Sequence, residues 1–291
     1  MIVRALQSSL RLHGKRGFHK STSLLYFYEP EKSNYPIIYD NLQKSQKLSL
    51  LGKFWEACRN VKYEFSLLHQ EIRDYFADNT AIIVPDAEDI IWKFDGTEKC
   101  RDQWIVTCDS DYNEGYSKAK LDFTAYGTGL FHGSLSPRVP KDGVIGKAGY
   151  CNVTSTRKRK SFYRKSFYDW SCYNTLVLRI RGDGRCYMLN VLQRGHYDMG
   201  WYHSFHYFIY TTGSPYWQHV KIPFSKFVFG TKGVIQNDQR PMPLDWITGF
   251  GITLGDKKEG PFKLEIDYIA LCYDPTVFEE CAYELYDVRK L

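Results

Sequence analysis

Apolar and polar residues alternate in short runs over much of the chain. The clearest run lies in residues 174–191, where Leu176, Leu178 and Ile180 recur at every second position. This period predicts a β-strand with one face toward a core and the other toward water. A Gly-Asp-Gly sequence follows, and a second strand pattern begins at Arg185. We therefore expect a β-hairpin with a tight turn over this stretch.

Strand patterns of this kind recur before and after that stretch, separated by clusters of glycine, proline and aspartate. They cover residues 91–94, 103–107, 117–124, 129–135, 148–156, 205–211, 217–222, 247–254 and 262–271. Long helical patterns do not alternate with them, which argues against a parallel α/β sheet. Many short strands with turn residues between them favour a mainly β fold built as a sandwich.

One stretch ahead of the strands has a helical pattern instead. Its apolar residues recur at alternating steps of four and three, which places them on one face of a helix over residues 54–75. They are Phe54, Cys58, Val61, Phe65, Leu68, Ile72 and Tyr75. Two interpretations are open, because such a face must be covered by something. Either the helix packs against the sandwich, or it docks a partner protein through Phe54, Val61, Phe65, Leu68 and Ile72.

Composition changes along the chain and predicts its organisation. Residues 1–25 combine basic, aliphatic and serine residues without any acid, which is typical of a leader for the mitochondrial matrix. Residues 26–45 are polar and contain two prolines, which favours a linker. We then expect a helical extension at residues 46–87, a β-sandwich domain at residues 88–275 and a C-terminal tail at residues 276–291.

The net charge of the chain is +6, but five of the positive charges lie in the predicted leader. Without residues 1–25 there remain 34 basic and 33 acidic residues, a net charge of +1. A domain of this charge has no net attraction for phosphate, so we expect no nucleic-acid partner. No run approaches the ~18 apolar residues of a membrane-spanning helix. We expect a soluble protein, or one that sits on a membrane through a partner.

Residues that could carry chemistry have simpler explanations. Asp109 and Asp111 could act as a glycosidase pair only across a sugar cleft, and their surroundings are typical of a turn. His203 and His206 are three residues apart, so on a strand they would point to opposite faces and could not share a metal. The basic residues 157–160 are followed by aromatic residues, and we interpret them as a solvated loop or a surface that docks onto an acidic protein. We expect no cofactor and no metal.

Four motifs occur in order along the strand-rich part of the chain. They are RIRGDGR at residues 179–185, YWQHVKIPFSKF at 216–227, GFGITLGDK at 249–257 and GPFKLEIDYI at 260–269. Together they resemble the mitochondrial complex I intermediate-associated protein family, thirty-kilodalton type, over residues 90–275. The resemblance implies a jelly-roll β-sandwich of the galactose-binding kind. It also implies a family-motif turn between the two strand patterns of residues 174–191. The turn residues are Gly182, Asp183, Gly184 and Arg185.

Members of that family help to assemble respiratory NADH:ubiquinone oxidoreductase. The resemblance therefore implies a non-catalytic assembly factor in the mitochondrial matrix, peripheral to the inner membrane. Its partners would be complex I assembly intermediates and other assembly factors, including acyl-CoA-dehydrogenase-like and membrane-anchored proteins. The alternative is a carbohydrate-binding module, for which Trp201, Tyr202 and Trp217 are candidates to stack on sugar rings.

Overall fold

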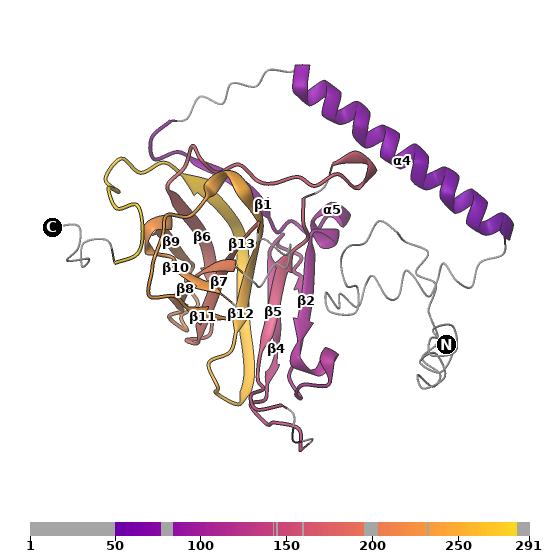
Figure 1. Ribbon diagram of the computed structural model, residues 1–291. Helices are drawn as coiled ribbons and strands as arrows, with labels where there is room; N and C mark the ends of the chain where they lie inside the picture. Colours follow the sequence, from indigo (N-terminus) through magenta and orange to yellow (C-terminus); the bar gives the residue numbers. More distant parts are fainter. Residues whose placement is uncertain are drawn as a thin grey trace, which may run out of the picture. The chain divides into compact units, whose positions relative to one another are not determined.

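The computed structural model describes residues 50–76, 84–141, 143, 145–158, 160–194, 203–231 and 233–283. The predicted leader, the predicted linker and residues 284–291 of the predicted tail lie outside this part of the chain. Within it, the strands form two antiparallel sheets that pack face to face around one hydrophobic core (Figure 1). The fold is a β-sandwich of the jelly-roll kind, so the mainly β fold class predicted from the sequence is confirmed.

The two sheets draw their strands from distant parts of the sequence. Sheet A has the order β3-β4-β13-β6-β9, and β1 also pairs with β13. Its strands are β1 (Glu88–Lys93), β3 (Lys118–Phe123), β4 (Gly129–Leu135), β6 (Thr175–Arg181), β9 (Gln218–Pro223) and β13 (Gly260–Cys272). Sheet B has the order β11-β10-β8-β7-β12-β5-β2. Its strands are β2 (Trp104–Cys108), β5 (Cys151–Ser155), β7 (Cys186–Gln193), β8 (His203–Tyr210), β10 (Val228–Thr231), β11 (Val234–Ile235) and β12 (Ile247–Leu254).

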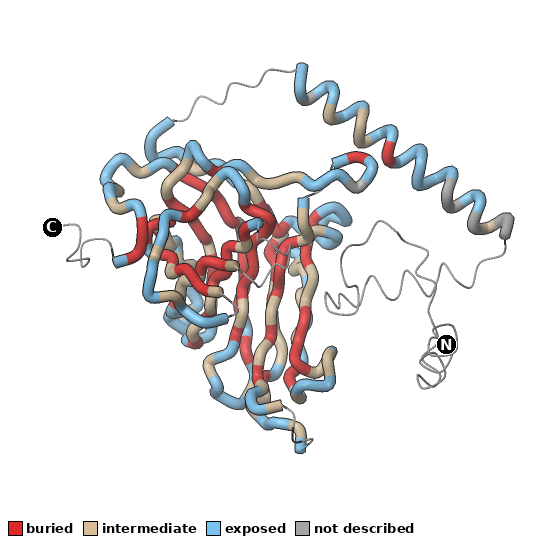
Figure 2. Tube along the Cα trace, viewed as in Figure 1, coloured by how far each residue is buried: buried red, intermediate tan, exposed pale blue. Residues whose placement is uncertain are grey.

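The core between the sheets follows the period of two in the sequence. Every second residue of β7, namely Tyr187, Leu189 and Val191, is buried in it. Across the core, the Phe250 ring of β12 stacks on the Trp92 ring of β1, with the ring centroids 6.0 Å apart. Figure 2 shows the buried positions gathered along the strands of both sheets. Because burial of each large apolar side chain contributes about 1.5–3 kcal/mol, this core is the main source of stability.

Helices make up little of the described chain. The predicted helix over residues 54–75 is confirmed as α4 (Leu50–Phe76). The short helix α5 (Glu98–Asp102) is capped by Thr97, whose hydroxyl oxygen accepts a hydrogen bond from the Cys100 N–H. Single 3₁₀ turns occur at η1 (Asp109–Tyr112), η2 (Ser161–Tyr163), η3 (Phe224–Lys226) and η4 (Leu244–Trp246). None of the described helices is both long and apolar enough to cross a membrane.

The strands β6 and β7 do not form the hairpin expected from the sequence. β6 pairs with β13 and β9 in sheet A, whereas β7 pairs with β12 and β8 in sheet B. Residues 182–185 therefore carry the chain from one sheet to the other. The hairpin prediction was wrong because alternation shows which side chains face a core, not which strand lies alongside. Two strands that face the same core from opposite sheets carry the same pattern.

A buried ion pair ties this crossover to a second one, the loop between β12 and β13. The Arg185 guanidinium donates two hydrogen bonds of 3.0 Å, one to each carboxylate oxygen of Asp256. Only 10% and 8% of these two side chains are exposed. The same guanidinium also donates to the backbone carbonyls of Lys258, Gly260 and Pro261. An arginine suits this place because its planar donors reach several acceptors at once.

The remaining residues of the turn support the same connection. The Asp183 carboxylate accepts hydrogen bonds from the Arg185 N–H at 3.1 Å and from the Lys263 N–H of β13 at 2.7 Å. Gly184 has a φ of +88°, a left-handed conformation that glycine adopts without strain. A Cβ on Gly182 would lie 2.3 Å from the Thr211 side chain, so only glycine fits there. The turn residues are thus explained by the closure of the sandwich.

We predict that Arg185→Met lowers the free energy of unfolding by about 3–5 kcal/mol, because it leaves the Asp256 carboxylate buried without its partner. The matched control is Arg138→Met, which breaks an exposed ion pair of 3.0 Å with Glu259 in the loop between β12 and β13. That variant should lose less than about 1 kcal/mol. Urea unfolding of the two variants measures the difference. Equal losses would show that the buried pair does not hold the crossovers together.

Candidate functional site

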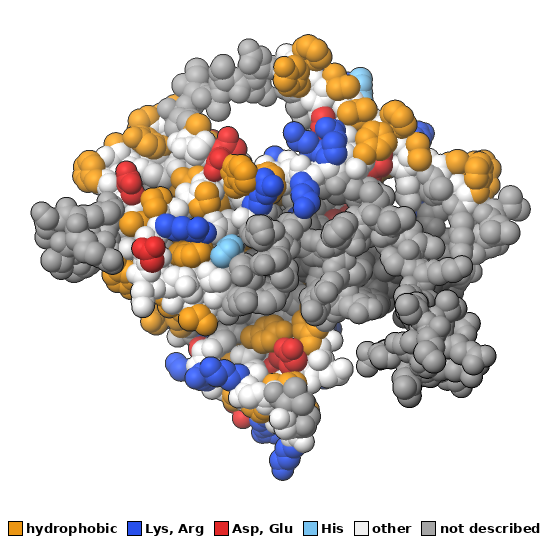
Figure 3. Space-filling view, viewed as in Figure 1, with side chains coloured by type: hydrophobic (Ala, Val, Ile, Leu, Met, Phe, Trp, Pro, Cys, Tyr) orange, Lys and Arg blue, Asp and Glu red, His pale blue; other side chains and the backbone are white. Residues whose placement is uncertain are grey.

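The apolar face of α4 is exposed. We call it the apolar row, and it consists of Phe54, Cys58, Val61, Phe65, Leu68, Ile72 and Tyr75. The exposed fractions of Phe54, Val61 and Ile72 are 62%, 52% and 48%, and only Leu68 is half-buried. None of these residues belongs to the hydrophobic core of the sandwich. Figure 3 shows hydrophobic side chains along the helix. Of the two interpretations open from the sequence, docking of a partner through this face stays a prediction.

Carboxylates beside the apolar row attach α4 to the turn η2. Glu64 is buried and accepts a hydrogen bond of 2.7 Å from the backbone N–H of Phe162. Glu71, two helical turns later, accepts from the backbone N–H of Ser161 and forms an ion pair with Arg164. The anchor is therefore polar, and it leaves most of the apolar row unused.

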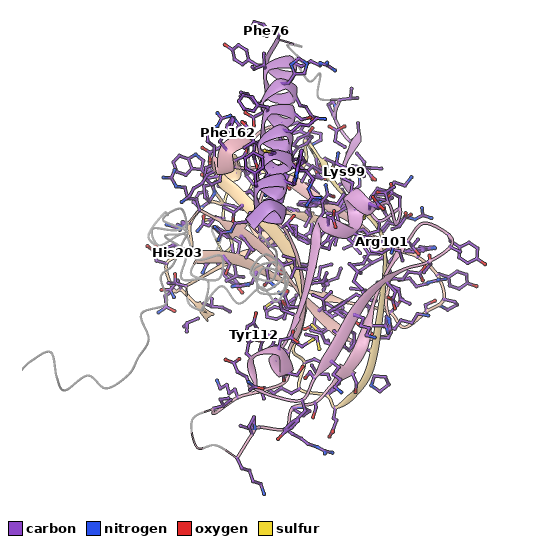
Figure 4. The ribbon with its side chains drawn as sticks, turned by 90° about the vertical axis from the view of Figure 1, so that its right-hand side faces the viewer. Phe76, Lys99, Arg101, Tyr112, Phe162 and His203 are labelled. Carbon is purple, nitrogen blue, oxygen red and sulfur yellow. The ribbon has the colours of Figure 1, made fainter. Side chains whose placement is uncertain are left out.

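The electrostatics of this anchor favour its charged form. The hydrogen bond from the Ser161 N–H, helped by the Arg164 guanidinium, lowers the pKa of the Glu71 carboxyl. The group is therefore ionised at neutral pH. Phe162 adds one apolar contact, with its ring edge-on to that of Phe65 and the ring centroids 5.4 Å apart. Figure 4 shows Phe162 beside α4. Phe162 has a φ of +55°, unusual for a residue with a side chain, so the fold holds η2 in a conformation that presents its N–H groups.

The loop between β5 and β6 contains the basic residues 157–160, which we interpreted from the sequence as a solvated loop or a surface for an acidic protein. Its Arg164 and the backbone of its η2 turn contact acids of this chain's own helix, Glu64 and Glu71. The Lys158 ammonium lies over the Tyr168 ring, 5.2 Å from the centroid. Sequence reasoning missed the two glutamates. Their spacing of seven residues along one flank of the apolar row was the signal that could have pointed to them.

The family-motif turn, Gly182 to Arg185, forms its hydrogen bonds within the sandwich. Three of the four sequence motifs meet there. Arg185 comes from the first motif, Asp256 from the third, and Gly260 from the fourth. The structure thus gives a physical reason for the residues on which the resemblance rests, namely the junction of the two crossovers.

The aromatic residues suggested for sugar stacking do not form a described platform. Trp201 and Tyr202 lie outside the described residues. Trp217 is close to the guanidinium groups of Arg179 and Arg181, at 5.3 and 5.1 Å from its ring centroid. Those arginines form ion pairs with acids of β13. Trp217 is therefore part of a charged ladder on sheet A.

The candidate chemical groups have partners within the chain. The buried Asp109 accepts hydrogen bonds from the N–H and hydroxyl of Ser117 and from the N–H of Gly149. Asp111 accepts from the Cys108 N–H at the start of the η1 turn, and Asp109 connects that turn to Ser117 and Gly149. His206 contacts the Asn190 side chain. Among the described residues, no group of three or more His, Cys, Asp or Glu side chains is arranged to hold a metal ion.

Solved structures similar to this chain include carbohydrate-binding modules. The family 11 module of a Clostridium thermocellum cellulosomal cellulase aligns with a TM-score of 0.46 and 18% identity, covering 66% of this chain and 96% of that chain. A family 30 carbohydrate-binding module aligns with a TM-score of 0.35 and 15% identity, covering 67% and 89% of the two chains.

Sequence comparison identifies much closer relatives. A family model described as Complex I intermediate-associated protein 30 matches residues 92–266. The Drosophila melanogaster protein "Complex I intermediate-associated protein 30, mitochondrial" is 42% identical over 268 residues, which cover 91% of this chain and 88% of that protein. The Mus musculus protein of the same name is 43% identical over 203 residues, covering 69% and 61% of the two. This chain therefore belongs to the Complex I intermediate-associated protein 30 family.

Proposed function

We propose that this protein is a non-catalytic assembly factor for mitochondrial respiratory complex I. Membership of the family supports this, since the relatives are named as complex I intermediate-associated and mitochondrial proteins. In this role it holds immature subunits at the matrix side of the inner membrane. It works there with other assembly factors, among them acyl-CoA-dehydrogenase-like and membrane-anchored proteins.

The observation that carries the proposal is the exposed apolar row of α4. The sandwich closes its own core, and the row lies outside that core. Contiguous exposed apolar residues usually mark a site of protein interaction. A side chain such as Ile72 contributes about 1.5–3 kcal/mol when a partner covers it completely. Several such residues on one helix are enough to drive association.

The polar anchor to η2 suits this role. Hydrogen bonds from two backbone N–H groups and an ion pair fix the helix and leave most of its apolar row exposed. A scaffold needs a helix that is ordered before the partner arrives, because ordering a flexible segment on binding weakens the association. We therefore assign partner docking to α4, with Phe54, Val61, Phe65, Leu68 and Ile72 as its contact residues.

Loss of the protein should lower the amount of assembled complex I and leave the other respiratory complexes near their normal levels. The measurement is native gel electrophoresis of mitochondria from cells that lack the protein, with re-expression of the wild-type chain as the control. Normal complex I in such cells would remove the proposed function.

Ile72→Glu should weaken the association with assembly partners by more than ten-fold. The reason is that burying a lone carboxylate costs several kcal/mol, and ~1.4 kcal/mol corresponds to a factor of ten. The unfolding temperature should stay unchanged, because Ile72 is 48% exposed. Ile72 is a cleaner choice than Phe65, whose ring contacts Phe162, or Leu68, which is half-buried.

The matched control is Gln70→Glu, which adds the same charge to an exposed position on another face of α4. It should bind partners and restore complex I like the wild type. Co-purification from mitochondria and thermal unfolding are measured on the same preparations. If Ile72→Glu unfolds at a much lower temperature while its folded fraction still binds, the helix belongs to the core and docking lies elsewhere.

A further inference from the structure

The apolar row of α4 has the spacing of a coiled-coil seam. Its steps of four and three repeat without interruption, so Cys58, Phe65 and Ile72 occupy position a of a heptad and Phe54, Val61, Leu68 and Tyr75 occupy position d. A helix that packs on a globular core usually has a wider apolar face, whereas two positions in seven match one facing helix. The helix spans 27 residues, which is enough for more than three heptads.

One flank of the seam is already occupied. Position g carries Glu64 and Glu71, the two acids that bind η2. Their carboxylates are therefore committed within this chain, on the side of the seam where Leu68 is half-buried. The Phe162 ring of η2 also lies edge-on to Phe65 at position a, so the open side of the seam is the side of position e. The anchor thus fixes which flank of α4 meets a partner.

The open flank is basic in its middle and aromatic at its ends. Position e carries Lys62 and His69, and the neighbouring position b carries Arg59 and Arg73. No acidic residue occupies position e or b anywhere between residues 50 and 76. At the two ends of the helix, position e is aromatic, and Trp55 and Phe76 are 71% and 77% exposed. Residues at e and g select the partner in coiled coils, because they meet the flank of the opposite helix.

We propose that α4 forms a coiled coil with a helix of another protein. The partner helix has an apolar heptad seam and an acidic flank. This inference rests on the proposed function and names the chemistry of the partner. The carboxylates on the flank of the partner helix would lie against Lys62 and His69. The acids of α4 itself, Glu64 and Glu71, bind η2 instead.

A second copy of this chain fits the seam poorly. In an antiparallel pair, position e faces position e, so each Lys62 would face a flank that carries no acidic residue. In a parallel pair, position e faces position g, where Glu64 and Glu71 of each copy are bound to its own η2 turn. Charge complementarity therefore favours a different protein over self-association.

The test uses two synthetic four-heptad peptides as probes. Both have leucine at every a and d position, and they differ only in carrying glutamate or lysine at every e and g position. Each is labelled, and its binding to the purified full chain is followed by fluorescence anisotropy. The glutamate peptide should bind about ten-fold more tightly, because several flank contacts of a few tenths of a kcal/mol change from attractive to repulsive in the lysine peptide. High salt should reduce the difference.

Variants of the chain separate the seam from its flank. Lys62→Glu should abolish or reverse the preference for the glutamate peptide, while Gln70→Glu, on another face, should leave it intact. Ile72→Glu should weaken the binding of both peptides. Circular dichroism and thermal unfolding show that each variant is folded.

Three results would overturn the inference. They are equal binding of the two peptides by the wild-type chain, no binding of either peptide, and a dimer of the chain in sedimentation that Ile72→Glu dissolves. The first two, found together with a loss of complex I in cells without the protein, would leave the proposed function standing and remove only the coiled coil. A dimer would identify the occupant as a second copy.

Discussion

The structure depends on one buried contact, the bidentate pair between Arg185 and Asp256. It joins two of the places where the chain passes from one sheet to the other, and the guanidinium also binds backbone carbonyls at the start of β13. A sandwich needs its sheets held in register over a common core. Here the core supplies most of the free energy of folding. The Arg185–Asp256 ion pair, together with the hydrogen bonds that the Asp183 carboxylate accepts, fixes the geometry of the crossovers. Removing one partner of a buried ion pair is strongly destabilising, because the remaining charge stays buried without a partner or water.

None of the residues of the apolar row of α4 belongs to the core that this contact helps to close. The helix brings a full row of apolar side chains, yet it is attached through Glu64 and Glu71. Polar attachment through backbone N–H groups fixes the helix in place and leaves the row to solvent. Under the proposed function, stability and recognition are carried by different residues of the chain, so variants of the row can be tested without unfolding the sandwich.

Much of this follows from local patterns in the sequence, and the rest depends on contacts between distant residues. The period of two located the strands, and the steps of four and three located α4, because both are set by side-chain geometry along a single element. The same patterns gave β6 and β7 the wrong partners, since pairing is decided by strands far away. The attachment of α4 to η2 could not be predicted from local patterns, because Glu64 and the N–H of Phe162 are 98 residues apart. Asp256 is 71 residues from Arg185, so the Gly-Asp-Gly pattern predicted a turn there but not the partner of Arg185.

The central claim is that the apolar row of α4 is a docking surface rather than part of the core. Amide hydrogen exchange, measured by mass spectrometry on the isolated protein and on the assembly intermediates that contain it, tests this most directly. We expect the amides of β7, β12 and β13 to be strongly protected in both samples, and those of α4 to gain strong protection only in the intermediates. Protection of α4 equal to that of β12 in the isolated protein, with no change on assembly, would contradict the account.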